Sequence, residues 1–113
     1  MKGISKLPKP KRPLSESTII EHRWLEFLAD KRKIHLTGDE LRVLLLIFRE
    51  TWGRNGRKPT YECWETILPD YFMLKTGLPE RSLRRILNKL EEKGVIERRK
   101  HGQNPQFRPS ETL

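Results

Sequence analysis

The sequence has a single cysteine, Cys63, and no long hydrophobic run. One cysteine excludes an internal disulfide and a cysteine-based zinc site, and it is consistent with a reducing compartment. No apolar stretch approaches the roughly 20 residues that a membrane-spanning helix requires. The N-terminus also lacks the apolar core of a secretory signal. The sequence therefore predicts a protein of the bacterial cytosol or nucleoid with no membrane segment.

Motifs for catalysis are missing as well. His22, His35 and His101 have no metal-ligand spacing among themselves or with Cys63. There is no phosphate-binding loop, no glycine-rich nucleotide fingerprint and no GxSxG elbow. We therefore expect no enzymatic activity, no cofactor and no metal. Cys63 is expected to be a small buried residue rather than a nucleophile.

Positive charge is what the sequence has in excess. Its 113 residues include 24 lysines and arginines against 15 acidic residues, for a formal net charge of +9. Such a charge indicates an acidic partner, with nucleic acid as the first candidate and an anionic membrane surface as the second. Charged residues make up 35% of the chain, and so do hydrophobic ones. This composition and the length favour one folded domain with polar tails.

The predicted organisation has three parts. Residues 1–16 contain five basic residues and three prolines, which favours a flexible basic arm. That arm is either a disordered solubilising leader or a DNA-contacting segment. Residues 17–108 are predicted to form the folded domain, and residues 109–113 a frayed C-terminal tail or the start of a linker.

Two helices are predicted in the first half of the domain. Thr18 and Glu21 form a possible capping box that would open a helix ending near Asp30. Thr37 and Glu40 form a second one, ahead of LRVLLLIFRETW. The second helix is apolar on nearly all sides, so we expect it at the centre of the core, or partly exposed in a dimer interface. Its main apolar face consists of Leu41, Leu44, Leu45, Phe48 and Trp52.

The middle of the chain is less regular. Residues 60–67 are compatible with a short strand, with Trp64 expected to anchor it to the core beside the other two tryptophans. Pro69 suits the first position of a short helix over about 70–75. That helix is expected to bury Tyr71, Phe72 and Leu74.

The segment from residue 70 to residue 100 is the most informative. Gly77 favours a turn with a left-handed conformation, and Pro79 suits the first turn of a helix running to about Lys93. A basic strand over 95–100, an HGQNP turn and a short return strand over 106–108 complete the pattern. The order short helix, turn, arginine-rich helix and basic hairpin predicts a winged helix-turn-helix, mainly α with a small β wing. The apolar stripe of its second helix consists of Leu83, Ile86, Leu87 and Leu90.

The opposite face of that helix carries the candidate DNA-binding residues. The side chains expected to contact bases are Arg81, Arg84, Arg85 and Asn88. Ser82 and Lys89 are better placed for phosphates. Acidic residues gather at the ends of the helix, so the stretch from Arg81 to Lys89 is expected to be free of carboxylates. The alternative is a merely solvated face whose arginines pair with nearby glutamates.

The predicted wing adds a second basic group, formed by Arg98, Arg99, Lys100, His101 and Arg108. Such residues usually contact phosphates or the neighbouring minor groove. The alternative is a charged hairpin that protects an edge strand from aggregation. Arg54, Arg57 and Lys58 form a third basic group, whose position relative to a duplex the sequence does not define.

Two stretches, LTGDELRVLLLIFRETWGR and ILPDYFMLKTGLPERSLRRILNKLEEKGVI, carry a family resemblance. Together they resemble the N-terminal domain of phage replication protein O and related phage and plasmid initiators, over roughly residues 18–100. The matching residues are Leu36, Thr37, Glu40, Trp52, Gly53, Thr76, Gly77, Leu78, Arg81, Leu90, Glu91, Gly94 and Ile96.

The resemblance implies binding of a homodimer to repeated double-stranded sites at a replication origin. It also implies a separate C-terminal portion, missing from this chain, that recruits a helicase or its loader. A transcriptional regulator of similar architecture is the near alternative. From another class of function, the domain could be a protein-interaction module that binds an acidic replication or host factor.

Overall fold

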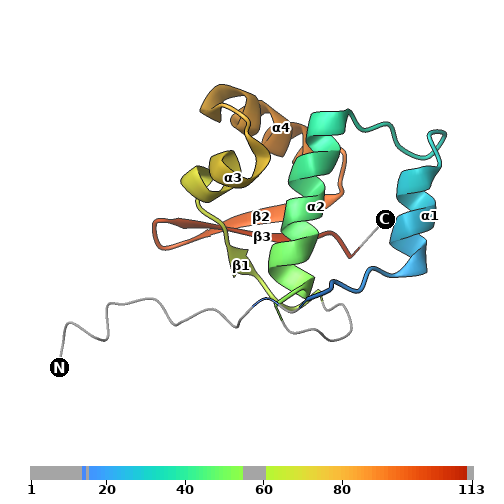
Figure 1. The fold of residues 1–113 in the computed structure, drawn as a ribbon, viewed down its shortest axis with the longest axis horizontal. Helices are drawn as coiled ribbons and strands as arrows, with labels where there is room; N and C mark the ends of the chain where they lie inside the picture. Colours follow the sequence, from blue (N-terminus) through green and yellow to red (C-terminus); the bar gives the residue numbers. More distant parts are fainter. Residues whose placement is uncertain (1–13, 15, 55–60, 112–113) are drawn as a thin grey trace.

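The computed structural model describes residue 14, residues 16–54 and residues 61–111. Within these ranges the chain forms four helices and a three-stranded antiparallel sheet (Figure 1). The elements in order are α1 (His22–Ala29), α2 (Gly38–Trp52), β1 (Glu65–Thr66), α3 (Pro69–Thr76), α4 (Glu80–Glu92), β2 (Ile96–His101) and β3 (Asn104–Pro109). A mainly helical chain with a small sheet is therefore confirmed. Almost all of the predicted basic arm lies outside the described residues.

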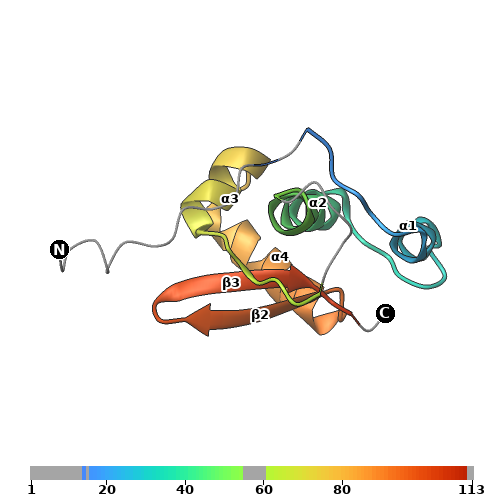
Figure 2. The ribbon, with the colours of Figure 1, turned by 90° about the horizontal axis from the view of Figure 1, so that it is seen from below.

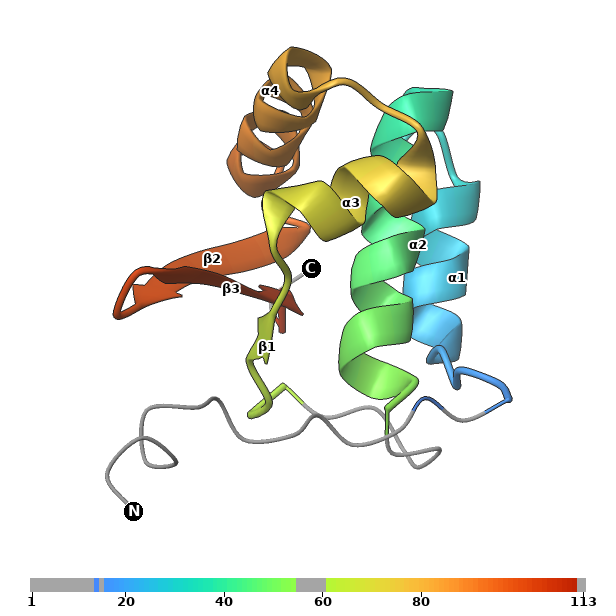
Figure 3. The same cartoon turned by 60° about the vertical axis from the view of Figure 1, so that its left-hand side comes forward.

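Helix α2 is the centre of the domain. Its N-terminus has the predicted capping box, in which the Thr37 hydroxyl accepts from the Glu40 backbone N–H and the Glu40 carboxylate accepts from the Thr37 backbone N–H. The helix lies between α1 on one side and α3 and α4 on the other (Figures 1 and 3). Its buried apolar side chains are Val43, Leu44, Leu46, Ile47, Phe48 and Trp52. The predicted core role is confirmed, but Leu41 and Leu45, four residues apart on one side of α2, are exposed.

Helix α1 packs on α2 through aromatic side chains. The ring of Trp24 is fully buried and meets Phe48 edge to face at 4.9 Å. The predicted capping box at Thr18 is wrong, since the helix begins at His22 and its N-cap residue, Glu21, makes no capping bond. The Glu21 carboxylate instead accepts from the Tyr61 hydroxyl, which joins α1 to the chain segment ahead of β1.

The sheet has the strand order β1–β3–β2, and Figure 2 shows the β2–β3 hairpin lying against α4. The hairpin turn has two residues, shorter than predicted, because His101 pairs with Asn104. Gly102 occupies that turn at φ 65°, a value that favours glycine. Pro109 and Ser110 were predicted to begin a frayed end, but Pro109 pairs with Ile96 and the Ser110 N–H donates to the Val95 carbonyl. The sheet thus extends past the predicted boundary at residue 108.

Helices α3 and α4 are joined by residues 77–79, with Gly77 at φ 74° as predicted. Pro69 occupies the first turn of α3, also as predicted. Phe72 is fully buried and packs edge to face on Phe107 of β3 at 5.3 Å. Leu74, however, is 77% exposed, because a short helix turns only one narrow face to the core.

Two acidic side chains of α2 are buried in ion pairs that hold the helices together. The Lys93 ammonium donates to the Glu40 carboxylate at 2.9 Å, and this ion pair joins the start of α2 to the end of α4. Glu50 is fully buried; it pairs with Arg54 and accepts a hydrogen bond of 2.9 Å from the hydroxyl of Tyr71 on α3. These contacts fix the position of α3 and α4 relative to the core.

Candidate nucleic-acid interface

Helix α4 has the two faces that its sequence predicts. Leu83, Ile86, Leu87 and Leu90 are buried against the core. The residues predicted to contact DNA lie on the other side of the helix. Five of them are exposed and one, Ser82, is half-buried; the exposed ones are Arg81, Arg84, Arg85, Asn88 and Lys89. The structure therefore brings all six predicted α4 residues onto one accessible surface.

The expectation that no carboxylate reaches this surface is wrong in part. The Arg84 guanidinium donates to the Glu80 carboxylate at 2.7 Å, four residues before it on the helix. Lys89 lies 3.7 Å from the carboxylate of Glu92. Both pairs are well exposed, and exposed pairs stabilise by about 0–1 kcal/mol, so a ligand can displace them easily.

Arg81 and Arg85 differ from Arg84. Neither makes a hydrogen bond or an ion pair with any residue in the described ranges. They occur in the first half of α4, four residues apart and hence on the same side of the helix. This part of the helix thus presents two guanidinium groups that have no competing anion among the described residues.

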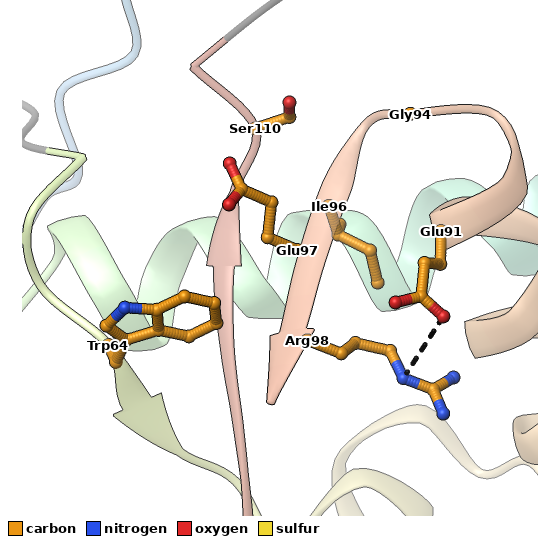
Figure 4. Close-up of a pocket in the computed structure, with 7 residues that line it drawn as sticks. All are labelled: Trp64, Glu91, Gly94, Ile96, Glu97, Arg98 and Ser110. Carbon is orange, nitrogen blue, oxygen red and sulfur yellow. Dashed lines mark ion pairs between the residues drawn. The ribbon is translucent and has the colours of Figure 1, made fainter. Parts of the chain in front are cut away.

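Asn88 is in contact with the hairpin. The Arg98 side chain on β2 donates from Nη1 to the Asn88 Oδ1 at 3.0 Å. The Nε of Arg98 also lies 3.7 Å from the Glu91 carboxylate, the ion pair drawn in Figure 4. The sequence alone does not predict this contact, because it joins side chains ten residues apart across the junction of a helix and a strand.

The basic residues of the hairpin lie on two opposite faces, because neighbouring side chains of a strand alternate. One face of the hairpin is directed toward α3 and α4. It carries Arg98 and Lys100, which line a groove together with Leu87 and Phe107. Arg99 lies on the other side, where its guanidinium covers the ring of Trp64 at 4.4 Å. The predicted wing residues are thus not a single group.

The predicted position of Trp64 is wrong. It was expected to anchor the core, but it is only partly buried and lies on the outer side of the sheet, beside β1 and β3 (Figure 4). Arg108 covers the same ring at 4.2 Å, and its guanidinium also donates to the Tyr61 carbonyl and to the Glu97 carboxylate. Trp24 and Trp52 are buried, as predicted. Trp64 directly precedes the two-residue strand β1 and is held on the outer side of the sheet by the two arginines.

Among the predicted basic residues that the structure describes, Arg108 and Arg54 have the most enclosed side chains. The Arg108 side chain is 23% exposed and held by Glu97. That of Arg54 is 14% exposed and pairs with Glu50 and, at 3.7 Å, with Glu65. Both guanidinium groups are therefore engaged in contacts within the fold. The other two residues of the third basic group, Arg57 and Lys58, lie outside the described residues.

Other chemistry is sparse in the described part of the chain. No group of three or more histidines, cysteines or carboxylates there is arranged to hold a metal ion. Cys63 was predicted to be buried but is exposed, because it precedes the short strand β1 in an open segment. Over the same ranges, none of the helices has the length and apolar character needed to cross a bilayer.

Comparison of the chain with protein-family models, with curated protein sequences and with solved structures found no match. The resemblance to phage and plasmid replication initiators accordingly stays a prediction.

Proposed function

We propose that this chain is a winged helix-turn-helix that binds double-stranded DNA by sequence, with α4 in the major groove. The order of the elements supports the proposal: α2, β1, the α3–α4 pair and then a hairpin that lies against α4. The turn of the α3–α4 pair has three residues and begins with Gly77 in the left-handed conformation, as helix-turn-helix units commonly do.

The observation that carries the proposal is the exposed, unpaired state of Arg81 and Arg85 within the described residues. In helix-turn-helix proteins the N-terminal residues of the second helix contact base edges, and arginine bonds guanine bidentately. Arg84 can also contact a base once its ion pair with Glu80 is broken. A net charge of +9 supplies the attraction to the phosphate backbone that such a complex requires.

Ser82 and Lys89 flank the proposed base-contacting residues and are assigned to phosphates. On the hairpin, Lys100 faces the same side as Arg98 and is near the turn, so it is the best placed of the wing residues for backbone contact. Arg99 can contact DNA only if its guanidinium leaves the Trp64 ring. We expect Arg108 to contribute least to DNA binding, because the Glu97 carboxylate and the Tyr61 carbonyl hold its guanidinium.

We further propose that the DNA is a set of repeats at a phage or mobile-element replication origin, bound by a homodimer. This part depends on the residues that resemble the initiator family. Leu41 and Leu45, exposed on α2, support a protein partner on that side of the domain, either a second copy or an acidic helicase-loading factor. A transcriptional regulator with the same DNA-binding mode is the alternative.

Selection of bound sequences from random duplex DNA, followed by mobility shifts, tests the proposal. We expect the wild-type chain to enrich a defined site, and Arg85→Ala to lose about 1–3 kcal/mol of affinity for it while binding random DNA nearly as before. The matched control is Arg32→Ala, which removes the same charge from the segment after α1, on the far side of α2 from α4. No binding at low salt, or equal affinity for all sequences, would overturn the proposal.

A further inference from the structure

The contact between Arg98 and Asn88 limits what Asn88 can offer to a base. An asparagine amide has an acceptor oxygen and a donor nitrogen, and it bonds adenine bidentately when both are available. Here the Oδ1 already accepts from Arg98 Nη1 at 3.0 Å. The Nδ2 has no partner among the described residues. The amide is thus oriented with its oxygen toward the hairpin and its nitrogen free.

From this geometry we infer that Arg98 is a specificity-determining residue that acts by positioning Asn88 as a hydrogen-bond donor. The inference rests on the proposed function of α4. It predicts that the base contacted by Asn88 presents acceptors in the major groove. Guanine, with its N7 and O6, fits this requirement, whereas adenine adds a donor, its N6 amino group.

The positive charge of Arg98 acts in the same direction. An adenine N6 amino group would have to share the Asn88 Oδ1 with a guanidinium, which repels the hydrogens of an amino group. Guanine places the lone pairs of O6 and N7 near the same cation, which attracts them. Glu91 restrains the guanidinium from its other end, at 3.7 Å from Nε, and keeps it directed at α4 (Figure 4). Hydrogen bonding therefore favours guanine over adenine, and the Arg98 charge, partly offset by Glu91, adds to the same preference.

The contact can form because of the register of β2. Ile96 is buried and Arg98 follows it on the same face, so Arg98 extends from the edge of the core toward α4. Its side chain is 33% exposed, which leaves it only partly solvated beside Asn88. Arg99, the neighbouring arginine, lies on Trp64 on the opposite face and cannot make the same contact.

Sequence selection with single variants tests the inference. Asn88→Ala identifies the base pair that Asn88 contacts, as the position where discrimination is lost. At that position we expect the wild type to favour guanine over adenine about tenfold. In Arg98→Met the side chain keeps a similar apolar stem but no longer donates to Asn88, so the Asn88 amide can rotate. The preference for guanine over adenine should then fall by about tenfold. Arg98→Lys, which keeps one donor, should retain part of the preference.

The matched control is Arg99→Met, which removes the same charge one residue away and on the other face. It should weaken binding to all sequences alike and leave the preference at the Asn88 position unchanged. A wild-type preference for adenine, or an Arg98→Met variant with an unchanged preference, would overturn the inference while the proposed function stands.

A second measurement needs no DNA. In nuclear magnetic resonance spectra of the free protein, the Asn88 side-chain amide should shift and become more mobile in Arg98→Met but not in Arg99→Met. Equal spectra in the two variants would overturn the positioning role. If the wild type selects no sequence at all, the proposed function and the predicted base preference both fail, and the spectra then report on the orientation of Asn88 alone.

Discussion

Glu50 is a single residue on which much of the packing between α2 and α3 depends. Its carboxylate is fully buried, with Arg49 at 3.1 Å, the Tyr71 hydroxyl at 2.9 Å and Arg54 close by. A buried charge is tolerated only when several partners replace the water it has lost. Arg54, a member of the third basic group, is one of those partners.

Glu50→Ala should therefore destabilise the fold by about 3 kcal/mol, because it leaves Arg54 and the Tyr71 hydroxyl without their main acceptor. Urea unfolding followed by tryptophan fluorescence measures the change. The control is Glu26→Ala, at an exposed position of α1, which should change the free energy of unfolding by no more than about 0.5 kcal/mol. A similar effect of both substitutions would contradict the structural role of Glu50.

Among the elements, α2 has the strongest local signals. Thr37 and Glu40 satisfy backbone donors at its start, and Gly53 follows its last turn, with its N–H donating to the Arg49 carbonyl. Helix α1 shows the opposite case. It has the same type of motif in sequence but no capping bond, since the Glu21 carboxylate is occupied by Tyr61 and Arg23.

Thr37→Ala should lower the free energy of unfolding by about 1 kcal/mol, the usual cost of a lost helix cap. Thr37→Ser keeps the hydroxyl and serves as the control, with little change expected. Chemical denaturation of both variants at neutral pH provides the comparison. Equal stability of the alanine and serine variants would show that the cap does not contribute.

For the molecule as a whole, the ion pair between Glu40 and Lys93 joins the first residues of the core helix to the end of α4. Burial alone would raise the pKa of the Glu40 carboxyl, but hydrogen bonds from the Thr37 N–H and the Lys93 ammonium outweigh it and lower that pKa below its usual 4.5. A lowered pKa in the folded state means that ionised Glu40 stabilises the protein above about pH 5. That contribution is lost as the pH falls through the folded-state pKa.

Glu40→Gln should thus be less stable than the wild type at pH 7 by about 1–3 kcal/mol, and the difference should shrink below pH 4.5. Thermal unfolding between pH 7 and pH 3 measures it. Part of the acid sensitivity should persist, because hydrogen bonds from Tyr61 and Arg32 lower the pKa values of Glu21 and Asp30. A constant difference between the two proteins at every pH would contradict the prediction.

Local sequence determined the parts of this protein in which one residue acts on its near neighbours. The cap of α2, the left-handed Gly77, Pro69 in the first turn of α3 and the buried stripe of α4 all follow from contacts within a turn or two of helix. The exposed face of α4 follows from the same periodicity, so its DNA-binding candidates could be identified without a structure.

Tertiary structure alone decided how the side chains of separate elements meet. It placed Trp64 beneath two arginines outside the core, exposed Leu41, Leu45 and Leu74, and enclosed Arg54 and Arg108 in ion pairs. It also brought Arg98 to Asn88. The physical reason is that periodicity defines which face of an element a residue occupies, whereas the partner of that face depends on strand register and helix packing. Those arise only when the whole core assembles.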